Sequence, residues 1–181
     1  MKNRFYQRKP TLVLSAVYIL SLFSGCSTIP KGATAVSNLD KAKYLGKWYE
    51  IARFDFSFEK HLNNTTAEYT IRKDGYIGVL NKGYNYKKNK WEEARGRARF
   101  RDSDTAGELE VSFFGPFYGA YNIIALDPDY KYALIAGKST KYLWILSREK
   151  TIPDEVKRSY LTAAEAAGYD TVRLIWVEHD Q

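Results

Sequence analysis

The fold of this chain is decided by the stretch Gly46-Lys47-Trp48-Tyr49-Glu50-Ile51-Ala52-Arg53. It opens with a Gly-x-Trp step and runs into alternating apolar and polar residues, a pattern typical of a strand. A large aromatic side chain near the start of a first strand can plug one end of a small barrel. The glycine before it lets the chain turn in tightly, because it has no Cβ. We therefore predict that the first strand of the folded domain begins here, with Trp48 as the plug.

Further short strand-like segments follow this stretch, separated by turn signals such as Asp74-Gly75 and Lys87-Lys88-Asn89-Lys90. Their regular spacing indicates a β-sandwich or a β-barrel. Strands joined in sequence order favour a mainly β fold, an eight-stranded antiparallel up-and-down β-barrel wide enough for one small ligand. The predicted strands cover residues 48–56, 65–73, 76–86, 91–101, 108–114, 119–127, 131–137 and 142–148.

One segment near the C-terminus has helical rather than strand periodicity. Pro153-Asp154-Glu155 is typical of a helix start, since proline fits the first turn and acidic side chains suit its positive end. Gly168 ends the pattern. The apolar side chains recur on one face, so we expect one C-terminal α-helix packed on the outside of the barrel. A final strand is predicted over residues 172–177, and a short helical turn over residues 39–45 with Asn38 as its cap.

The first 25 residues have the features of an export signal. A basic start is followed by an uncharged apolar run over residues 11–23, which is shorter than the ~20 residues that a membrane-spanning helix needs. Small residues Ser24 and Gly25 then precede Cys26, the single cysteine of the chain, so no internal disulfide can form. We predict a signal peptide over residues 1–25, a tether over residues 26–37 and the barrel domain over residues 38–181. A free thiol in a signal peptide cut elsewhere is the alternative.

The net charge of +7 comes largely from this leader, which holds four basic and no acidic residues. Nucleic-acid binding therefore loses its main support. The alternate arginines of residues 91–101 indicate a solvated strand face, with binding of anionic lipid headgroups as the alternative. The chain has two histidines, His61 and His179, and no Gly-x-Ser-x-Gly motif. The sequence thus predicts a binding protein, with no catalytic residue, no metal and no cofactor.

Strand alternation predicts which side chains face the barrel interior. Glu108 and Glu110 must face water, so the alternate residues Leu109, Val111 and Phe113 face inward. The inward row of residues 91–101 is mostly small, which favours a cavity over large side chains packing from opposite strands. Other inward sets are Trp48, Glu50, Ala52 and Phe54; Ile77, Val79, Asn81 and Gly83; and Tyr142, Trp144, Leu146 and Arg148.

Three motifs in this order resemble those of the lipocalin family: the Gly-x-Trp step, Asp127-Pro128-Asp129-Tyr130, and Leu143-Trp144-Ile145-Leu146-Ser147-Arg148. In detail the sequence is similar to the bacterial outer-membrane lipocalins, over roughly residues 30–178. Phe23-Ser24-Gly25-Cys26 resembles a lipobox, although phenylalanine replaces the usual leucine. The resemblance implies that Cys26 is acylated and holds the protein at the outer membrane, facing the periplasm.

The resemblance also implies a structural pair and three residues that line the ligand cavity, Tyr69, Asn81 and Trp144. Trp48 and Arg148 would stack at the closed end as a structural pair. Strand alternation adds further inward residues, so the candidates for the ligand site are Glu50, Tyr69, Asn81, Phe113, Tyr121 and Trp144. For Glu50 the alternative is a buried carboxylate paired with a neighbouring arginine or tyrosine.

The implied ligands are fatty acids or lysophospholipids, held for storage or transport of membrane lipids. Three other interpretations were weighed: a carrier of another small hydrophobic ligand, a structural lipoprotein with a filled barrel, and a lipid-modifying enzyme. The sequence leaves a homodimer open.

Overall fold

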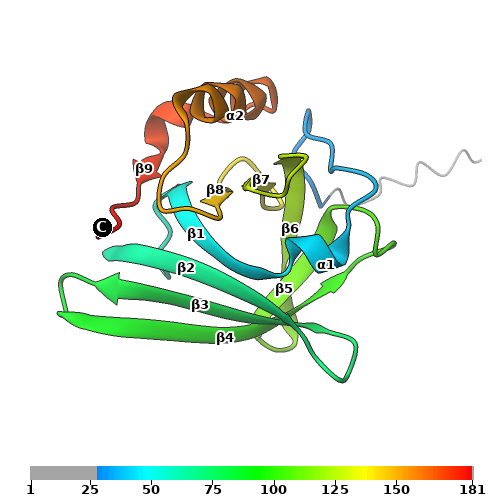
Figure 1. Ribbon diagram of the computed structural model, residues 1–181, viewed down its shortest axis with the longest axis horizontal. Helices are drawn as coiled ribbons and strands as arrows, with labels where there is room; N and C mark the ends of the chain where they lie inside the picture. Colours follow the sequence, from blue (N-terminus) through cyan, green and yellow to red (C-terminus); the bar gives the residue numbers. More distant parts are fainter. Residues whose placement is uncertain (1–27, 181) are drawn as a thin grey trace, which may run out of the picture.

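Strand β1 (Gly46–Arg53) closes the sheet, because it pairs with β2 on one side and with β8 on the other. The computed structural model describes residues 28–180, so the predicted signal peptide and Cys26 lie outside the described residues. All neighbouring strands are antiparallel and follow the sequence order. The predicted eight-stranded up-and-down barrel is therefore confirmed (Figure 1). The other seven barrel strands are β2 (Leu62–Ile71), β3 (Ile77–Asn85), β4 (Lys90–Phe100), β5 (Glu108–Phe114), β6 (Phe117–Leu126), β7 (Tyr132–Ala136) and β8 (Leu143–Ser147).

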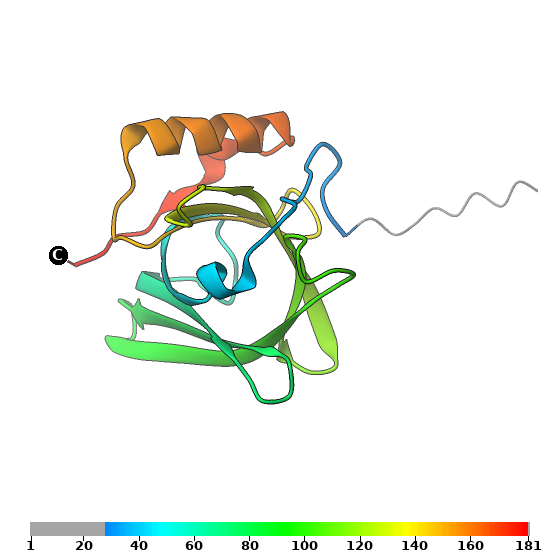
Figure 2. The same ribbon diagram turned by 45° about the vertical axis from the view of Figure 1, so that its right-hand side comes forward.

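The predicted C-terminal helix is also present, as α2 (Asp154–Ala166), and it lies outside the barrel above β7 and β8 in both views (Figures 1 and 2). A second hydrophobic cluster fills the space beneath it, with Tyr160 and Ala164 packing on the outer face of β1, β7 and β8. The predicted strand over residues 172–177 is shorter than expected. Its first part forms a 3-10 turn, η1 (Thr171–Arg173), and only β9 (Ile175–Trp176) pairs with β1.

A short helix, α1 (Lys41–Tyr44), covers one end of the barrel, as expected from residues 39–45. Its cap is Asp40 and not Asn38, since the Asp40 carboxylate accepts hydrogen bonds from the N–H groups of Ala42 and Lys43 at 3.0 and 3.3 Å. Asn38 instead has a positive φ of 57° and lies in the turn that leads to the helix.

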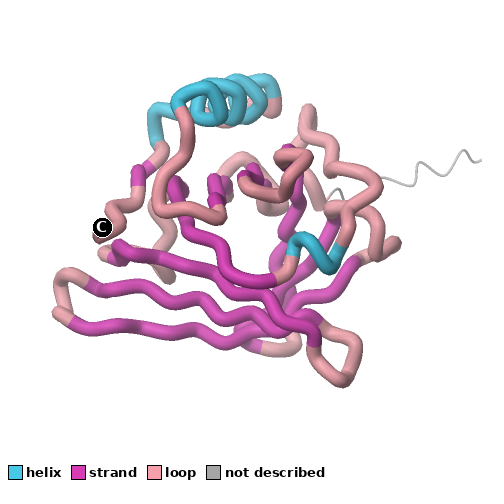
Figure 3. Tube along the Cα trace, in the orientation of Figure 1, coloured by secondary structure: helices cyan, strands magenta, loops and turns pink. Residues whose placement is uncertain are grey.

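The end of the barrel beside α1 is called the closed end below. Strand β3 runs away from it toward the opposite, open end, on the left of Figure 1. Four connections lie at the open end, at residues 54–61, 86–89, 115–116 and 137–142, and they are drawn as pink loops in Figure 3.

A β-bulge in β1 changes which side chains face the interior. Glu50 pairs with Leu146, but Ala52 pairs with Ile145, so one extra residue is inserted around Ile51. Beyond the bulge the alternation is reversed. Ala52 therefore packs on the outer side, beneath α2, against the prediction that it faces inward.

The inward orientation predicted for Phe54 is wrong for the same reason. Its ring lies in the outer cluster, 5.9 Å from the ring of Tyr169. Arg53 takes the inward position instead, opposite Trp144 of β8.

Candidate functional site

The closed end is built around Trp48, which is fully buried. The Arg148 guanidinium lies 3.8 Å from the centre of its indole ring, and the Trp48 Nε1 donates a hydrogen bond to the Tyr44 carbonyl at 2.9 Å. Gly46 reaches this corner with φ +91°, a conformation that favours glycine. Arg148 also donates to backbone carbonyls of α1 and the residues after it, at Lys43, Tyr44, Leu45 and Lys47. Trp48 and Arg148 thus fasten α1 across the barrel end.

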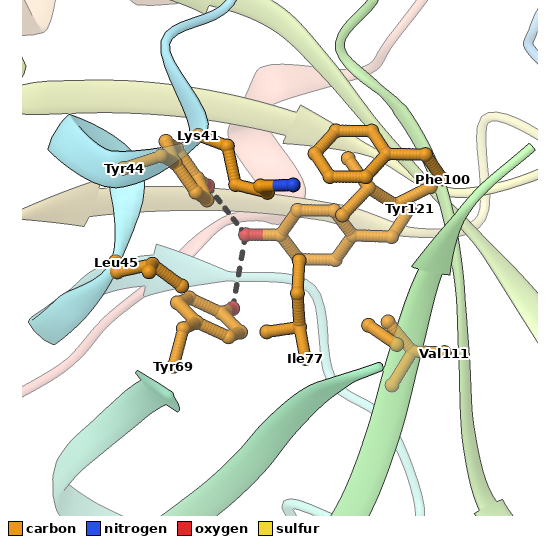
Figure 4. Close-up of a pocket in the computed structure, with 10 residues that line it drawn as sticks. Lys41, Tyr44, Leu45, Tyr69, Ile77, Phe100, Val111 and Tyr121 are labelled. Atoms are coloured by element: carbon orange, nitrogen blue, oxygen red, sulfur yellow. Dashed lines mark hydrogen bonds between the residues drawn. The ribbon is translucent and has the colours of Figure 1, made fainter. Parts of the chain in front are cut away.

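Next to this plug, three tyrosine hydroxyls meet inside the barrel (Figure 4). The Tyr121 oxygen lies 2.6 Å from that of Tyr44 and 3.0 Å from that of Tyr69. Burial raises the pKa of all three phenols, so they stay neutral and can donate and accept hydrogen bonds. They line a cavity of only about 10 Å³, the space of roughly one water molecule. Tyr69 and Tyr121, two of the predicted ligand contacts, therefore sit at the floor of the barrel.

The wall above this floor contains Asn81 and Phe113. Asn81 lies between Ala67 and Ala94 in the sheet, and its Oδ1 is buried without a hydrogen-bond partner among residues 28–180. The Phe113 ring lies over Gly96, where an added Cβ would come within 2.8 Å of the ring. The Phe113 ring thus fills the space that the predicted row of small β4 residues leaves at Gly96. Ala94 of the same row stays exposed, farther toward the open end.

At the open end, a buried polar cluster joins Glu50, Arg53, Glu59 and Trp144. Arg53 Nη1 donates to Glu50 Oε1 at 2.6 Å, and Arg53 Nη2 donates to the backbone carbonyls of Glu59 and Leu62 at 2.9 and 3.0 Å. The Trp144 Nε1 donates to Glu59 Oε2 at 3.1 Å. Glu50 is therefore a buried carboxylate paired with an arginine, the alternative that the sequence left open.

Sequence reasoning missed Arg53 and Glu59 as members of this cluster. Arg53 shares a face with Glu50 only because of the bulge, which puts these i and i+3 residues on the same side. Glu59 comes from the connection between β1 and β2, whose conformation no local pattern predicts. A buried charge at Glu50 was the one available signal that a cationic partner had to lie nearby.

Aromatic rings cover this polar cluster. The Phe56 ring centre lies 4.8 Å from that of Trp144 and 5.2 Å from those of Phe58 and Tyr142. Phe56 and Phe58 belong to the connection between β1 and β2, Tyr142 ends the connection before β8, and Trp144 lies in β8. The ring contacts hold the connection after β1 against β8, and they make Trp144 part of both the polar cluster and the aromatic wall.

The charges of the cluster do not balance when both carboxylates are ionised, because Arg53 supplies the single cation. Burial, and secondarily the nearby Glu59 carboxylate, raises the pKa of Glu50 to about 8. Burial also raises the pKa of Glu59, while its hydrogen bond from Trp144 opposes that rise. The pair therefore binds more protons in the folded chain than in the unfolded chain at neutral pH.

This proton uptake predicts a pH dependence of stability. The folded protein binds more protons than the unfolded chain between about pH 4.5 and pH 8, so the free energy of unfolding should fall as the pH rises through that window. Glu50→Gln removes one carboxylate and should flatten the fall. Urea unfolding of the parent protein and of Glu50→Gln at pH 5, 6.5 and 8 measures this pH dependence. A parallel pH dependence in the two proteins would show that the cluster does not take up these protons.

A groove of about 500 Å³ lies beside the mouth, where β1 and β2 separate. The C-terminal tail runs along it: the Val177 N–H bonds to the Ile51 carbonyl at 2.9 Å, and the Asn64 N–H bonds to the Glu178 carbonyl at 2.8 Å. The tail thus bridges the two strands at the open end. Other residues that line the groove are Arg53, Lys60, His61, Tyr86 and Trp176.

The eight-stranded barrel, the tryptophan–arginine closure and the outer helix define a lipocalin. The chain belongs to the lipocalin family, since a family model described as a lipocalin-like domain matches residues 39–179. It is 47% identical over 169 residues to the outer membrane lipoprotein Blc of Escherichia coli (strain K12), covering 93% of this chain and 96% of that protein. It is 50% identical over 168 residues to the Blc protein of Citrobacter freundii, covering 92% and 95%.

Relatives outside bacteria are more distant. Rat apolipoprotein D is 36% identical over 126 residues, which cover 65% of each chain. The solved structure of insecticyanin from the tobacco hornworm has a TM-score of 0.68 at 20% identity, covering 86% of this chain and 88% of that one. This likeness shows the fold alone.

Within residues 28–180, no helix is both long and apolar enough to cross a membrane. In the same part of the chain, no group of three or more His, Cys, Asp or Glu side chains is placed to hold a metal ion.

Proposed function

We propose that this chain is a membrane-anchored carrier that holds a fatty acid or a lysophospholipid in its barrel, for storage or transport of membrane lipids. The observation that carries the proposal is the layered interior. Aromatic rings around Trp144 form an apolar wall at the mouth, and buried polar groups lie beneath them at Glu50 and Asn81. Such a site suits a ligand with an acyl chain and a polar head. The names of the relatives from E. coli and C. freundii, outer membrane lipoproteins, support the membrane setting.

The cluster at the mouth favours binding over catalysis. Arg53 compensates one carboxylate, and Trp144 donates a hydrogen bond to the other. Neither carboxylate is paired with a nucleophilic side chain through a hydrogen bond among the described residues. We therefore propose a carrier and not a lipid-modifying enzyme.

Ligand binding should be reported by Trp144. Titration with a monomeric fatty acid should change the protein fluorescence, because the chain would replace water next to this indole. The change should disappear in Trp144→Phe and persist in Trp91→Phe, since Trp91 lies on β4 beside the polar turn at residues 86–89. Trp144→Ala should weaken binding by about 1–3 kcal/mol, the value of one apolar wall.

If the fluorescence change survived in Trp144→Phe, the ligand would have to lie elsewhere. Mass spectra of the protein purified from cells provide an independent check, because a carrier should bring a fatty acid or lysophospholipid with it. An empty barrel in such spectra, together with no binding in titration, would favour the structural lipoprotein.

We further propose that Cys26 is acylated and anchors the mature protein in the outer membrane on its periplasmic side. Cys26→Ser should abolish partition into the detergent phase, since the acyl chains would be lost. Fractionation followed by mass measurement of the N-terminal peptide checks this. Full membrane association of the variant, with an unmodified residue 26 in the parent protein, would contradict the anchor.

A further inference from the structure

Exposed aromatic side chains gather at the open end of the barrel. Six large ones flank or belong to its connections, and three of them are more than 60% exposed. Each of the four open-end connections contains one of these rings or is flanked by one. At the closed end, Ile71 is the one comparable exposed apolar side chain among residues 28–180. The six are Phe58, Tyr86, Trp91, Phe114, Phe117 and Tyr142, called the aromatic rim below.

The rim is interspersed with lysines. Lys60, Lys87, Lys90 and Lys141 come from three of the same four connections or their flanks, and all are exposed. None of them forms an ion pair with a carboxylate of residues 28–180, whereas Lys88 does, with Glu92. Ion pairs at the closed end include Arg72–Asp74, Lys41–Asp104 and Lys131–Asp129. The open end therefore presents apolar rings together with free positive charge.

From the rim and the lysines, we propose that the open end docks on an anionic membrane surface. Aromatic rings settle at the boundary between headgroups and acyl chains, and lysines neutralise anionic headgroups while their stems cover apolar surface. A patch of exposed rings of this kind marks an interaction site. The mouth then faces the bilayer, so a lipid can pass between membrane and barrel without crossing water. This deepens the proposed carrier function and rests on it for the ligand, but the docking itself is tested separately.

The test uses two labelled variants of the full-length exported protein. Phe117→Cys places a thiol on the rim, and Ile71→Cys places one at the closed end as the matched control. The native Cys26 is the single other cysteine and is consumed by acylation, so each variant carries one free thiol for an environment-sensitive fluorophore. The proteins are reconstituted on vesicles of phosphatidylcholine with and without phosphatidylglycerol, and a quencher is carried on the lipid chains.

Docking predicts that the label at position 117 shifts to the blue and is quenched on vesicles with phosphatidylglycerol, and that the label at position 71 behaves as in buffer. Replacing both Lys87 and Lys90 by glutamine should weaken the response on anionic vesicles, about fivefold per lysine at low salt. Native Trp91 gives a second signal without any label. Its emission should shift on anionic vesicles in the parent protein but not in a Phe114→Ser/Phe117→Ser double variant.

Equal water exposure of the labels at positions 117 and 71, with no shift of Trp91, would overturn the proposal. Protection of position 117 that rises with protein concentration in the absence of vesicles would also overturn it, because a second copy of the chain would then cover the rim. Acylation is read independently from the mass of the N-terminal peptide, and ligand binding from fatty-acid titration in buffer. Failure of docking is therefore distinguishable from failure of the anchor or of the carrier function.

Discussion

Trp48→Ala should lower the free energy of unfolding by about 3–5 kcal/mol, the range for a large aromatic side chain lost from a packed core. Trp48 is fully buried, its Nε1 bonds to the Tyr44 carbonyl, and its ring carries the Arg148 guanidinium. Removal of the indole opens a void at the closed end and takes away the surface on which Arg148 lies. Chemical denaturation at fixed pH measures the loss as a shift of the unfolding midpoint.

Trp48→Phe is the matched control for this prediction. It keeps an aromatic ring under Arg148 but lacks the N–H group, so its loss should be clearly smaller than that of the alanine variant. Fatty-acid affinity should change little in any folded fraction, because Trp48 lies at the floor and not at the mouth. Retained stability combined with lost binding would show that Trp48 belongs to the ligand site.

The second large effect is expected at Arg53. Arg53→Met should destabilise the fold by about 3–5 kcal/mol above pH 8, since it leaves two buried carboxylates without their cation. It also removes the donor to the Glu59 and Leu62 carbonyls. At pH 5 the loss should be smaller, because Glu50 and Glu59 can both take up protons. Unfolding curves at the two pH values give the difference directly.

A triple variant separates charge from packing. Arg53→Met combined with Glu50→Gln and Glu59→Gln removes all three charges, and it should recover much of the lost stability at high pH. A triple variant as unstable as Arg53→Met alone would mean that the hydrogen bonds of Arg53 to the two carbonyls, and not the charge balance, hold this end of β1.

The sequence was sufficient to predict the barrel, because alternation and turn signals are local. The strands of residues 76–101 and the helix from Asp154 were predicted within a few residues. The interior of β1 was predicted only as far as Glu50. Beyond it, one inserted residue at the bulge reverses the alternation, and no feature of Ile51-Ala52 shows this insertion in the sequence.

The candidate site was less predictable for a related reason. Tyr69, Tyr121, Asn81 and Trp144 lie on inner faces that alternation predicts. Their partners come from outside the strands: Tyr44 from α1 and Glu59 from the connection after β1. Loop conformation depends on contacts far apart in the sequence, so the polar cluster at the mouth became visible only in three dimensions.

The position of β1 between β2 and β8, with the tail alongside, has a consequence for when the protein can fold. The first strand meets its last partners only after nearly the whole chain has been synthesised, because β8 and β9 lie at the far end of the sequence. Such non-local pairing slows folding, since a long loop must close before its contacts stabilise it. A nascent chain therefore cannot complete the barrel prematurely.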